Sequence, residues 1–174
     1  MGDANEYVFV TRWRVEASIE EVSEILDDAE GLARWWPSVY LEVKKLPDGV
    51  IRLYTKGWLP YTLRWQFRVT ESRRPHGFSL EATGDLVGRG VWTLTQDGPY
   101  TEVVYDWRIR ADKPLLRRFS FIVKPLFAAN HNWAMARGEE SLKLELLRRR
   151  ARDETERAQI PPPPRPTFRS QPAT

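Results

Sequence analysis

Residues 124–142 read KPLFAANHNWAMARGEESL, and they begin the longest helical pattern in the chain. The stretches before them carry short helical signals and alternating, strand-like runs. A sheet made of such strands needs a cover for its apolar face, and one long helix can supply it. The sequence therefore predicts an α+β domain organised around a C-terminal helix.

The inner face of this helix has an unusual residue pattern. A turn of about 100° per residue puts charged or amide side chains on the solvent side: Asn132, Glu139, Lys143 and Arg150. The opposite face is centred on small and polar residues: Asn130, Ala134, Arg137, Gly138 and Ser141. Bulkier residues flank that centre: Leu126, Trp133, Leu144 and Leu147 on one side, and His131, Met135, Leu142 and Leu146 on the other. A core helix carries its bulk at the centre, so this pattern indicates room beneath the helix.

The N-terminal region predicts one strand and two short helices. Residues 6–15 alternate between apolar and polar side chains, as a half-buried strand does. Ser18 stands three residues before Glu21, which is a capping-box pattern, and apolar residues follow at helical spacing. Asp27 is the expected start of a second short helix, which Pro37 ends after Trp36.

Six further strands are predicted between residues 39 and 109. They cover residues 39–46, 50–56, 61–69, 78–83, 86–94 and 103–109, with turn residues between most of them. The glycines at Gly84, Gly88 and Gly90 predict a bend in a curved sheet, or a point where another group approaches the backbone closely. Together with the first strand, the six strands are expected to form a seven-stranded antiparallel meander.

The helical C-terminus is expected to begin at Lys113-Pro114, and Pro125 predicts a break or kink near Lys124.

Composition excludes several classes of function. The 174 residues contain no cysteine and two histidines, His76 and His131, so we expect no metal and no cofactor. The net charge of +3 owes much to a cluster at Arg148, Arg149, Arg150 and Arg152, without interleaved aromatics, which argues against nucleic-acid binding. No apolar run approaches the roughly 18 residues that a membrane span needs, and the N-terminus lacks a signal-peptide pattern. We expect a cytoplasmic protein.

Eight tryptophans favour an aromatic core, part of which lines a cavity. The predicted ligand-binding residues come from the strands and from the long helix: Trp65, Phe67, Trp92, Tyr105, Trp107, Asn130, Trp133, Arg137 and Ser141. Two interpretations of the inward polar residues stay open. Asn130 and Arg137 either pair with strand residues such as Asp85 or Glu81, or orient the polar end of an apolar ligand. His131 is either a hydrogen-bonded structural residue or a general base.

The order of elements resembles the helix-grip fold of the START/Bet v 1-like proteins. Four segments resemble bacterial polyketide cyclase/dehydrase-like (SRPBCC) proteins: residues 35–40, 57–61, 84–90 and 130–133. The resemblance covers roughly residues 5–150. It implies a hydrophobic ligand, lipid- or polyketide-like, held between the curved sheet and the long helix.

Three functions follow as hypotheses. The first is a carrier or sensor of a small hydrophobic molecule. The alternative is a cyclase- or dehydratase-like enzyme, with His131, Arg137 or Asp85 as weak catalytic candidates. A third is an interaction protein that recruits a partner through the proline-rich segment at residues 161–166. We expect the domain to span residues 1–152 and a charged helix end with a disordered, proline-rich tail to span residues 153–174.

Overall fold

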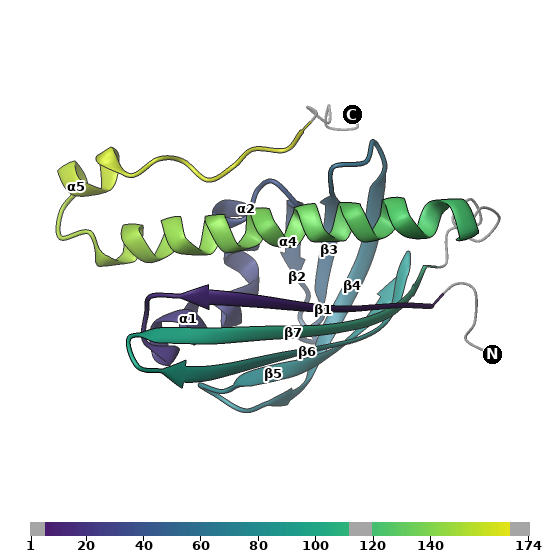
Figure 1. Cartoon of the computed structure of the whole chain (residues 1–174), viewed down its shortest axis with the longest axis horizontal. Helices are drawn as coiled ribbons and strands as arrows, with labels where there is room; N and C mark the ends of the chain where they lie inside the picture. The colour runs from purple at the N-terminus through teal and green to yellow at the C-terminus, as the bar shows by residue number, and fades with distance from the viewer. Residues whose placement is uncertain (1–5, 112–119, 168–174) are drawn as a thin grey trace.

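The computed structural model of the chain describes residues 6–111 and 120–167 (Figure 1). The order of elements is β1 (Glu6–Val15), α1 (Ile19–Asp27), a 3₁₀ turn (Ala29–Gly31), α2 (Leu32–Trp35), β2 (Tyr40–Lys45), β3 (Ile51–Lys56), β4 (Thr62–Ser72), β5 (Gly77–Gly84), β6 (Leu86–Asp97), β7 (Tyr100–Ala111), α4 (Ser120–Arg150) and α5 (Glu154–Gln159). This is the order that the sequence predicts, with α5 added.

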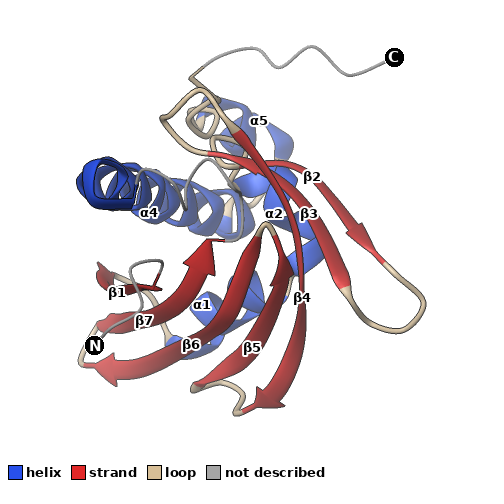
Figure 2. Ribbon diagram, turned by 90° about the vertical axis from the view of Figure 1, so that its right-hand side faces the viewer, coloured by secondary structure: helices blue, strands red, loops and turns tan. Residues whose placement is uncertain are grey.

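The strands form one antiparallel sheet in the order β1-β7-β6-β5-β4-β3-β2, so seven strands are described. Figure 2 shows the sheet curving around α1 and α2, with α4 lying along the opening between the two sheet edges. Contacts of α4 with β1, α1 and α2 hold this arrangement together. The α+β helix-grip architecture is therefore confirmed.

Alternation along the strands decides which side chains enter the core. On β7, Val103, Tyr105, Trp107 and Ile109 are all buried, as their two-residue spacing predicts. Val69 on β4 is an exception, because its side chain is 46% exposed although the pattern places it inside. A register shift follows it on β4, between Val69 and Glu71.

α1 and the 3₁₀ turn that leads into α2 each begin at a side-chain cap. Ser18 Oγ accepts a hydrogen bond from Glu21 N at 3.2 Å, and Glu21 Oε2 accepts one from Ser18 N at 2.9 Å, which confirms the capping box of α1. The cap of the second short helical segment differs from the predicted one by one residue. Asp28, and not Asp27, caps the 3₁₀ turn, because its Oδ1 accepts a hydrogen bond from Gly31 N at 3.0 Å.

The helix α4 runs without a break from Ser120 to Arg150, with Pro125 inside it. The predicted break near Lys124 is therefore wrong. Pro125 lies in the second turn of α4, so its missing N–H costs one hydrogen bond near the helix start. The predicted opening at Lys113-Pro114 lies outside the described residues.

α4 is rotated relative to the predicted inner face. Leu142 and Leu146, expected at one flank, are fully buried, whereas Leu126 and Leu147 on the other flank are 44% and 48% exposed. Arg137, expected near the centre, pairs with Glu140 on the same helix at 2.9 Å and is 39% exposed. The rotation buries Met135 and Leu142 and leaves Arg137 half-buried, with its Nε buried and its Nη1 paired to Glu140.

The C-terminal half of α4 is held by buried and half-buried ion pairs. Glu145 is 2% exposed, and Arg34 Nη1 of α2 donates to its two carboxylate oxygens at 2.8 and 2.9 Å. Arg149 Nε donates to the same carboxylate at 3.1 Å. One turn further, Arg150 donates to both oxygens of Glu21 on α1 at 2.8 and 3.0 Å. These contacts fix α4 to both short helices.

The chain after α4 returns alongside it (Figure 1). Asp153 caps α5 by accepting from Glu156 N at 2.8 Å, and Arg148 donates to the carbonyl oxygen of Pro161 at 2.6 Å. These contacts hold α5 and the segment after it to the end of α4, in the region where the sequence predicted a charged helix end followed by a proline-rich tail. Residues 168–174 lie outside the described part.

Candidate functional site

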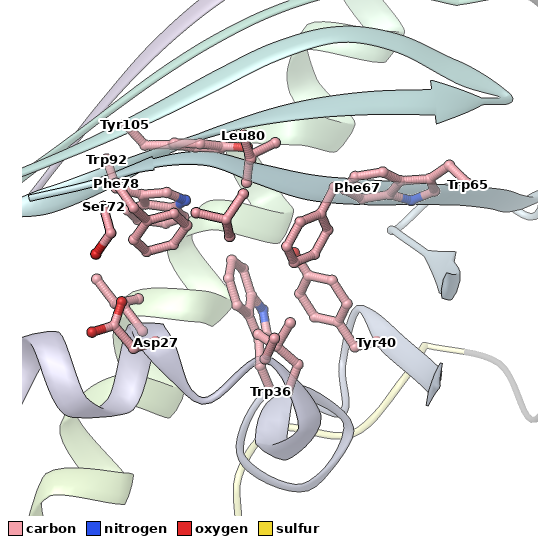
Figure 3. Close-up of a pocket in the computed structure, with 14 residues that line it drawn as sticks. Asp27, Trp36, Tyr40, Trp65, Phe67, Ser72, Phe78, Leu80, Trp92 and Tyr105 are labelled. Carbon is pink, nitrogen blue, oxygen red and sulfur yellow. The ribbon is translucent and has the colours of Figure 1, made fainter. Parts of the chain in front are cut away.

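Two of the pockets bounded by the described residues lie side by side between the sheet and the helices. We call them the α1 cavity, of about 80 Å³, and the α4 cavity, of about 90 Å³. The α1 cavity is lined by Leu26, Asp27, Ala29, Leu32, Trp36, Tyr40, Trp65, Phe67, Val69, Ser72, Phe78, Leu80, Trp92 and Tyr105 (Figure 3). The α4 cavity is lined by Trp36, Val39, Tyr40, Thr55, Lys56, Gly57, Leu63, Trp65, Leu86, Tyr105, Trp107, Ile109, Phe127, Asn130, His131, Ala134 and Met135.

Four aromatic residues line both cavities: Trp36, Tyr40, Trp65 and Tyr105. We call these four the shared wall, and the two cavities with this wall the chamber. In Figure 3 the rings of Trp36, at the end of α2, and Tyr40, at the start of the edge strand β2, lie opposite Phe67, Trp92 and Tyr105 on the other strands. The chamber is therefore one aromatic space divided in the middle by side chains.

Strand geometry positions the sheet side of the wall. Tyr105 on β7 stands opposite Trp92 on β6, and the two rings stack with centroids 4.0 Å apart at an interplanar angle of 16°. The Tyr105 ring lies over Gly90, where an added Cβ would come within 2.8 Å of the Tyr105 hydroxyl oxygen. The sequence left two interpretations of this glycine, a bend in the sheet or a close approach of another group to the backbone. The contact with the Tyr105 ring supports the close approach.

The position of Trp36 in the shared wall depends on where α2 ends. Trp36 is the C-cap of α2 and leaves helical geometry, with φ −125° and ψ 55°, just before Pro37. Its ring, 2% exposed, packs against Gly138 of α4, where an added Cβ would come within 2.3 Å of the indole. Gly138 therefore makes room for Trp36 under the helix.

The polar atoms of the shared wall differ in whether they have a hydrogen-bond partner. Trp65 Nε1 donates to Thr55 Oγ1 at 2.9 Å. Trp36 Nε1 is buried and has no hydrogen-bond partner within the described ranges. Burial raises the pKa of Tyr40 and of Tyr105, so both phenols stay protonated at neutral pH.

His131 lies in the α4 cavity as a neutral imidazole. Its ring stacks on Phe9 with centroids 4.2 Å apart, and its Nε2 lies 3.4 Å from Thr11 Oγ1. Burial lowers the pKa of His131 to about 4, because desolvation disfavours the imidazolium. A base with that pKa is poorly matched to proton abstraction near neutral pH.

Asn130 connects α4 to the loop between β3 and β4. Its Oδ1 accepts a hydrogen bond from Leu59 N at 2.9 Å, and its amide packs on Gly57, where an added Cβ would lie 2.3 Å from that oxygen. The polar partner of Asn130 is thus a loop backbone, in place of the predicted Asp85 or Glu81. The contact fixes the loop beside the α4 cavity.

The structure brings six of the nine predicted ligand-binding residues to the chamber: Trp65, Phe67, Trp92, Tyr105, Trp107 and Asn130. Trp133, Arg137 and Ser141 line neither cavity. Among the catalytic candidates, His131 lines the α4 cavity, while Arg137 and Asp85 line neither. Asp85 accepts a hydrogen bond from Arg64 N at 2.8 Å, beside β4.

Two wall residues, Trp36 and Tyr40, were missed as site residues. Trp36 follows the last residue of α2, where helical periodicity has ended, and Tyr40 is the first residue of β2, where the alternation has only begun. The local signal was the aromatic run at residues 35–40, noted for its resemblance to relatives.

Within residues 6–111 and 120–167, no three His, Asp or Glu side chains gather as a metal site would need. In the same ranges, the helices are too short or too polar to cross a bilayer.

Solved structures of low sequence identity share the fold. Zhui aromatase/cyclase from Streptomyces sp. R1128 is 20% identical, covers 84% of this chain and 97% of its own, and superposes with a TM-score of 0.63. A START superfamily protein from Mycobacterium smegmatis is 16% identical, with 80% and 96% covered and a TM-score of 0.60. Norcoclaurine synthase from Thalictrum flavum, in complex with a transition state analogue, is 15% identical, with 84% and 97% covered and a TM-score of 0.59.

No curated protein matches the sequence at a significant level. Residues 8–146 match the family described as "Polyketide cyclase / dehydrase and lipid transport". Since the match spans well over half of the chain, the protein belongs to this family.

Proposed function

We propose that the protein binds a small apolar molecule in the chamber, as a carrier or a sensor. The observation that carries this proposal is the pair of adjacent cavities divided by a wall of four aromatic side chains. Well-packed interiors contain few voids larger than a water molecule, and apolar voids favour apolar guests. The family description, which includes lipid transport, supports the same function.

The cavity volumes limit the size of the ligand. An engineered apolar cavity of roughly 150 Å³ holds benzene, and drug-sized ligands occupy about 300–1,000 Å³. Neither the α1 cavity, at about 80 Å³, nor the α4 cavity, at about 90 Å³, reaches these values. A ligand must therefore span the shared wall by displacing its rings, and a molecule of one or two rings fits best.

The placement of the ionisable candidates favours binding over catalysis. An enzyme of the cyclase or dehydratase kind needs an acid and a base that reach the same bound molecule. Of His131, Arg137 and Asp85, His131 alone lines either of the two cavities, and its lowered pKa weakens it as a base.

A filling substitution tests the proposal. Ala134 lines the α4 cavity, whereas Ala136, two residues away on the same helix, is exposed. Ala134→Phe should abolish the change in tryptophan fluorescence that indane causes in the native protein, and Ala136→Phe should leave it intact. The proposal fails if indane does not bind the native protein, or if both variants bind indane as the native protein does.

A further inference from the structure

Among the described residues that line the α1 cavity, one carries a charge, and the inference drawn from it rests on the proposed function. This residue is Asp27, the last residue of α1, which borders the cavity among mostly aromatic and aliphatic side chains. Its side chain is only 13% exposed. A carboxylate in apolar surroundings is costly unless its oxygens accept hydrogen bonds. The partners of Asp27 therefore decide what this end of the chamber can bind.

One of the two Asp27 carboxylate oxygens holds all of its hydrogen bonds with the described residues. Ser23 Oγ, one turn earlier on α1, donates to Asp27 Oδ2 at 3.2 Å, and Arg74 Nε donates to the same oxygen. Asp27 Oδ1 accepts no hydrogen bond from a described residue. Asp28 supplies the cap of the 3₁₀ turn, so the Asp27 carboxylate is not used for capping. Because an ionised carboxylate can accept at both oxygens, Oδ1 is available to a ligand.

Asp27 lies at an end of the chamber that borders solvent. Its ion pair with Arg74 ties α1 to the turn after β4, and Ser72, the last residue of β4, lines the α1 cavity and is exposed. In Figure 3 the Asp27 carboxylate and the Ser72 hydroxyl lie at the same end of the cavity, away from Trp65. A ligand whose rings occupy the shared wall therefore has one end near Asp27.

We propose that Asp27 Oδ1 accepts a hydrogen bond from a hydroxyl group of the ligand, at the α1 end of the chamber. The ligand class is an uncharged, compact ring system that carries an alcohol or a phenol. A hydrogen bond from a hydroxyl to a carboxylate is charge-assisted and stronger than one between two neutral groups. Asp27 is then the residue that selects for a hydroxyl on an otherwise apolar molecule.

The charges at this end of the chamber favour a neutral donor over an ionised group. Asp27 repels a ligand carboxylate. An ammonium would meet a second cation at the same carboxylate, because the guanidinium of Arg74, with a side chain 67% exposed, already offsets the Asp27 charge from the solvent side. A ketone has no proton to donate to Oδ1. A hydroxyl meets none of these obstacles.

The test compares 1-indanol, 1-indanone and indane, which share one carbon skeleton, in calorimetric titrations of the full chain. 1-Indanol should bind the native protein about tenfold more tightly than 1-indanone. In Asp27→Asn the ratio of 1-indanol to indane affinity should fall about three- to tenfold, since an amide oxygen accepts a weaker hydrogen bond than a carboxylate. A substitution that merely disturbed the cavity would lower both affinities and leave their ratio constant.

Arg74→Met is the matched control, because it breaks the ion pair with Asp27 and leaves both carboxylate oxygens in place. This variant should keep the native preference for 1-indanol over indane. If the preference falls in Arg74→Met as far as in Asp27→Asn, the ion pair is responsible in place of a bond to the ligand, and the proposal is overturned.

Two further results would overturn the hydroxyl subsite. One is an unchanged ratio of 1-indanol to indane affinity in Asp27→Asn. The other is binding of 1-indanone, or of 1-aminoindane as its ammonium, to the native protein as tightly as 1-indanol. If indane binds and either result appears, the subsite fails and the proposed function stands. If neither indane nor 1-indanol binds the native protein, both fail.

Discussion

The two halves of α4 do different work although they belong to one continuous helix. The N-terminal half places Asn130, His131, Ala134 and Met135 around the α4 cavity. The C-terminal half buries Leu142 completely, and ion pairs of Glu145 and Arg150 tie it to α2 and α1. The helix is therefore tied to α1 and α2 by ion pairs at one end and borders the α4 cavity at the other. Binding can be altered in the first half without loss of the anchor.

A pair of truncations should separate the halves most strongly. Leu142→Ala removes a side chain that is 0% exposed, so we expect the free energy of unfolding to fall by about 3 kcal/mol. Met135→Ala removes a side chain that already borders the α4 cavity, and it should cost less while increasing the affinity for a two-ring ligand. Urea denaturation and indane titration of both variants measure this. Equal losses of stability in the two variants, with indane binding unchanged in both, would contradict the claim that the two halves of α4 have different roles.

The anchor itself is tested at Glu145. Glu145→Gln removes the buried charge that Arg34 and Arg149 hold, and we expect a loss of about 1–3 kcal/mol with little change in ligand affinity. The loss is limited because Arg34 is 56% exposed and can be hydrated when its partner is gone. Glu140→Gln, in the surface pair with Arg137, is the control and should cost under about 0.5 kcal/mol. A Glu145 variant as stable as the Glu140 variant would remove the anchor from the account.

The acid sensitivity of the ligand half should come from His131. Its pKa is about 4 in the folded chain against 6.5 for the free group, so the unfolded chain binds more protons between these values. Stability is therefore full above about pH 6.5 and falls as the pH is lowered toward 4. His131→Phe should flatten this part of the curve in urea titrations at several pH values. An unchanged slope in the variant would show that another group is responsible.

The C-terminal half of α4 should lose stability at a lower pH than the half that carries His131, and the loss should be smaller. The Arg150 guanidinium and the cap at Ser18 lower the pKa of Glu21 to about 2, from its ordinary value of 4.5. The stabilisation is present above about pH 4.5 and is lost as the pH falls toward 2. Solvent screens this half-exposed pair, so the effect is the smallest of the four. Arg150→Met should remove the slope between pH 2 and 4.5 and leave the slope of His131 in place; loss of both slopes would contradict the separation.

Periodicity and capping predicted most of the fold. The two-residue alternation on β7 identified Tyr105 and Trp107 as inward residues, and the Ser18–Glu21 spacing identified the start of α1. Strand alternation and cap spacing predict structure correctly here because they depend only on residues that are close in sequence. They can be recognised without knowledge of the tertiary packing.

The parts that could not be predicted depend on contacts between distant residues. Glu145 was not among the residues predicted for the inner face, and its burial requires Arg34, which is 111 residues away in sequence. Trp36 enters the wall because Gly138 leaves space for its ring. The rotation of α4 that exposes Arg137 likewise follows from packing against the sheet and the short helices, which no local pattern records.

The tryptophan indole signals in a ¹H–¹⁵N NMR titration with 1-indanone test the central claim most directly. The signals of Trp36, Trp65, Trp92 and Trp107 should shift together along one saturating curve, because these residues line the chamber. The signal of Trp58, which is 46% exposed, should stay in place. If no chamber tryptophan shifts, or if Trp58 shifts alone, then α4 does not cover a ligand site.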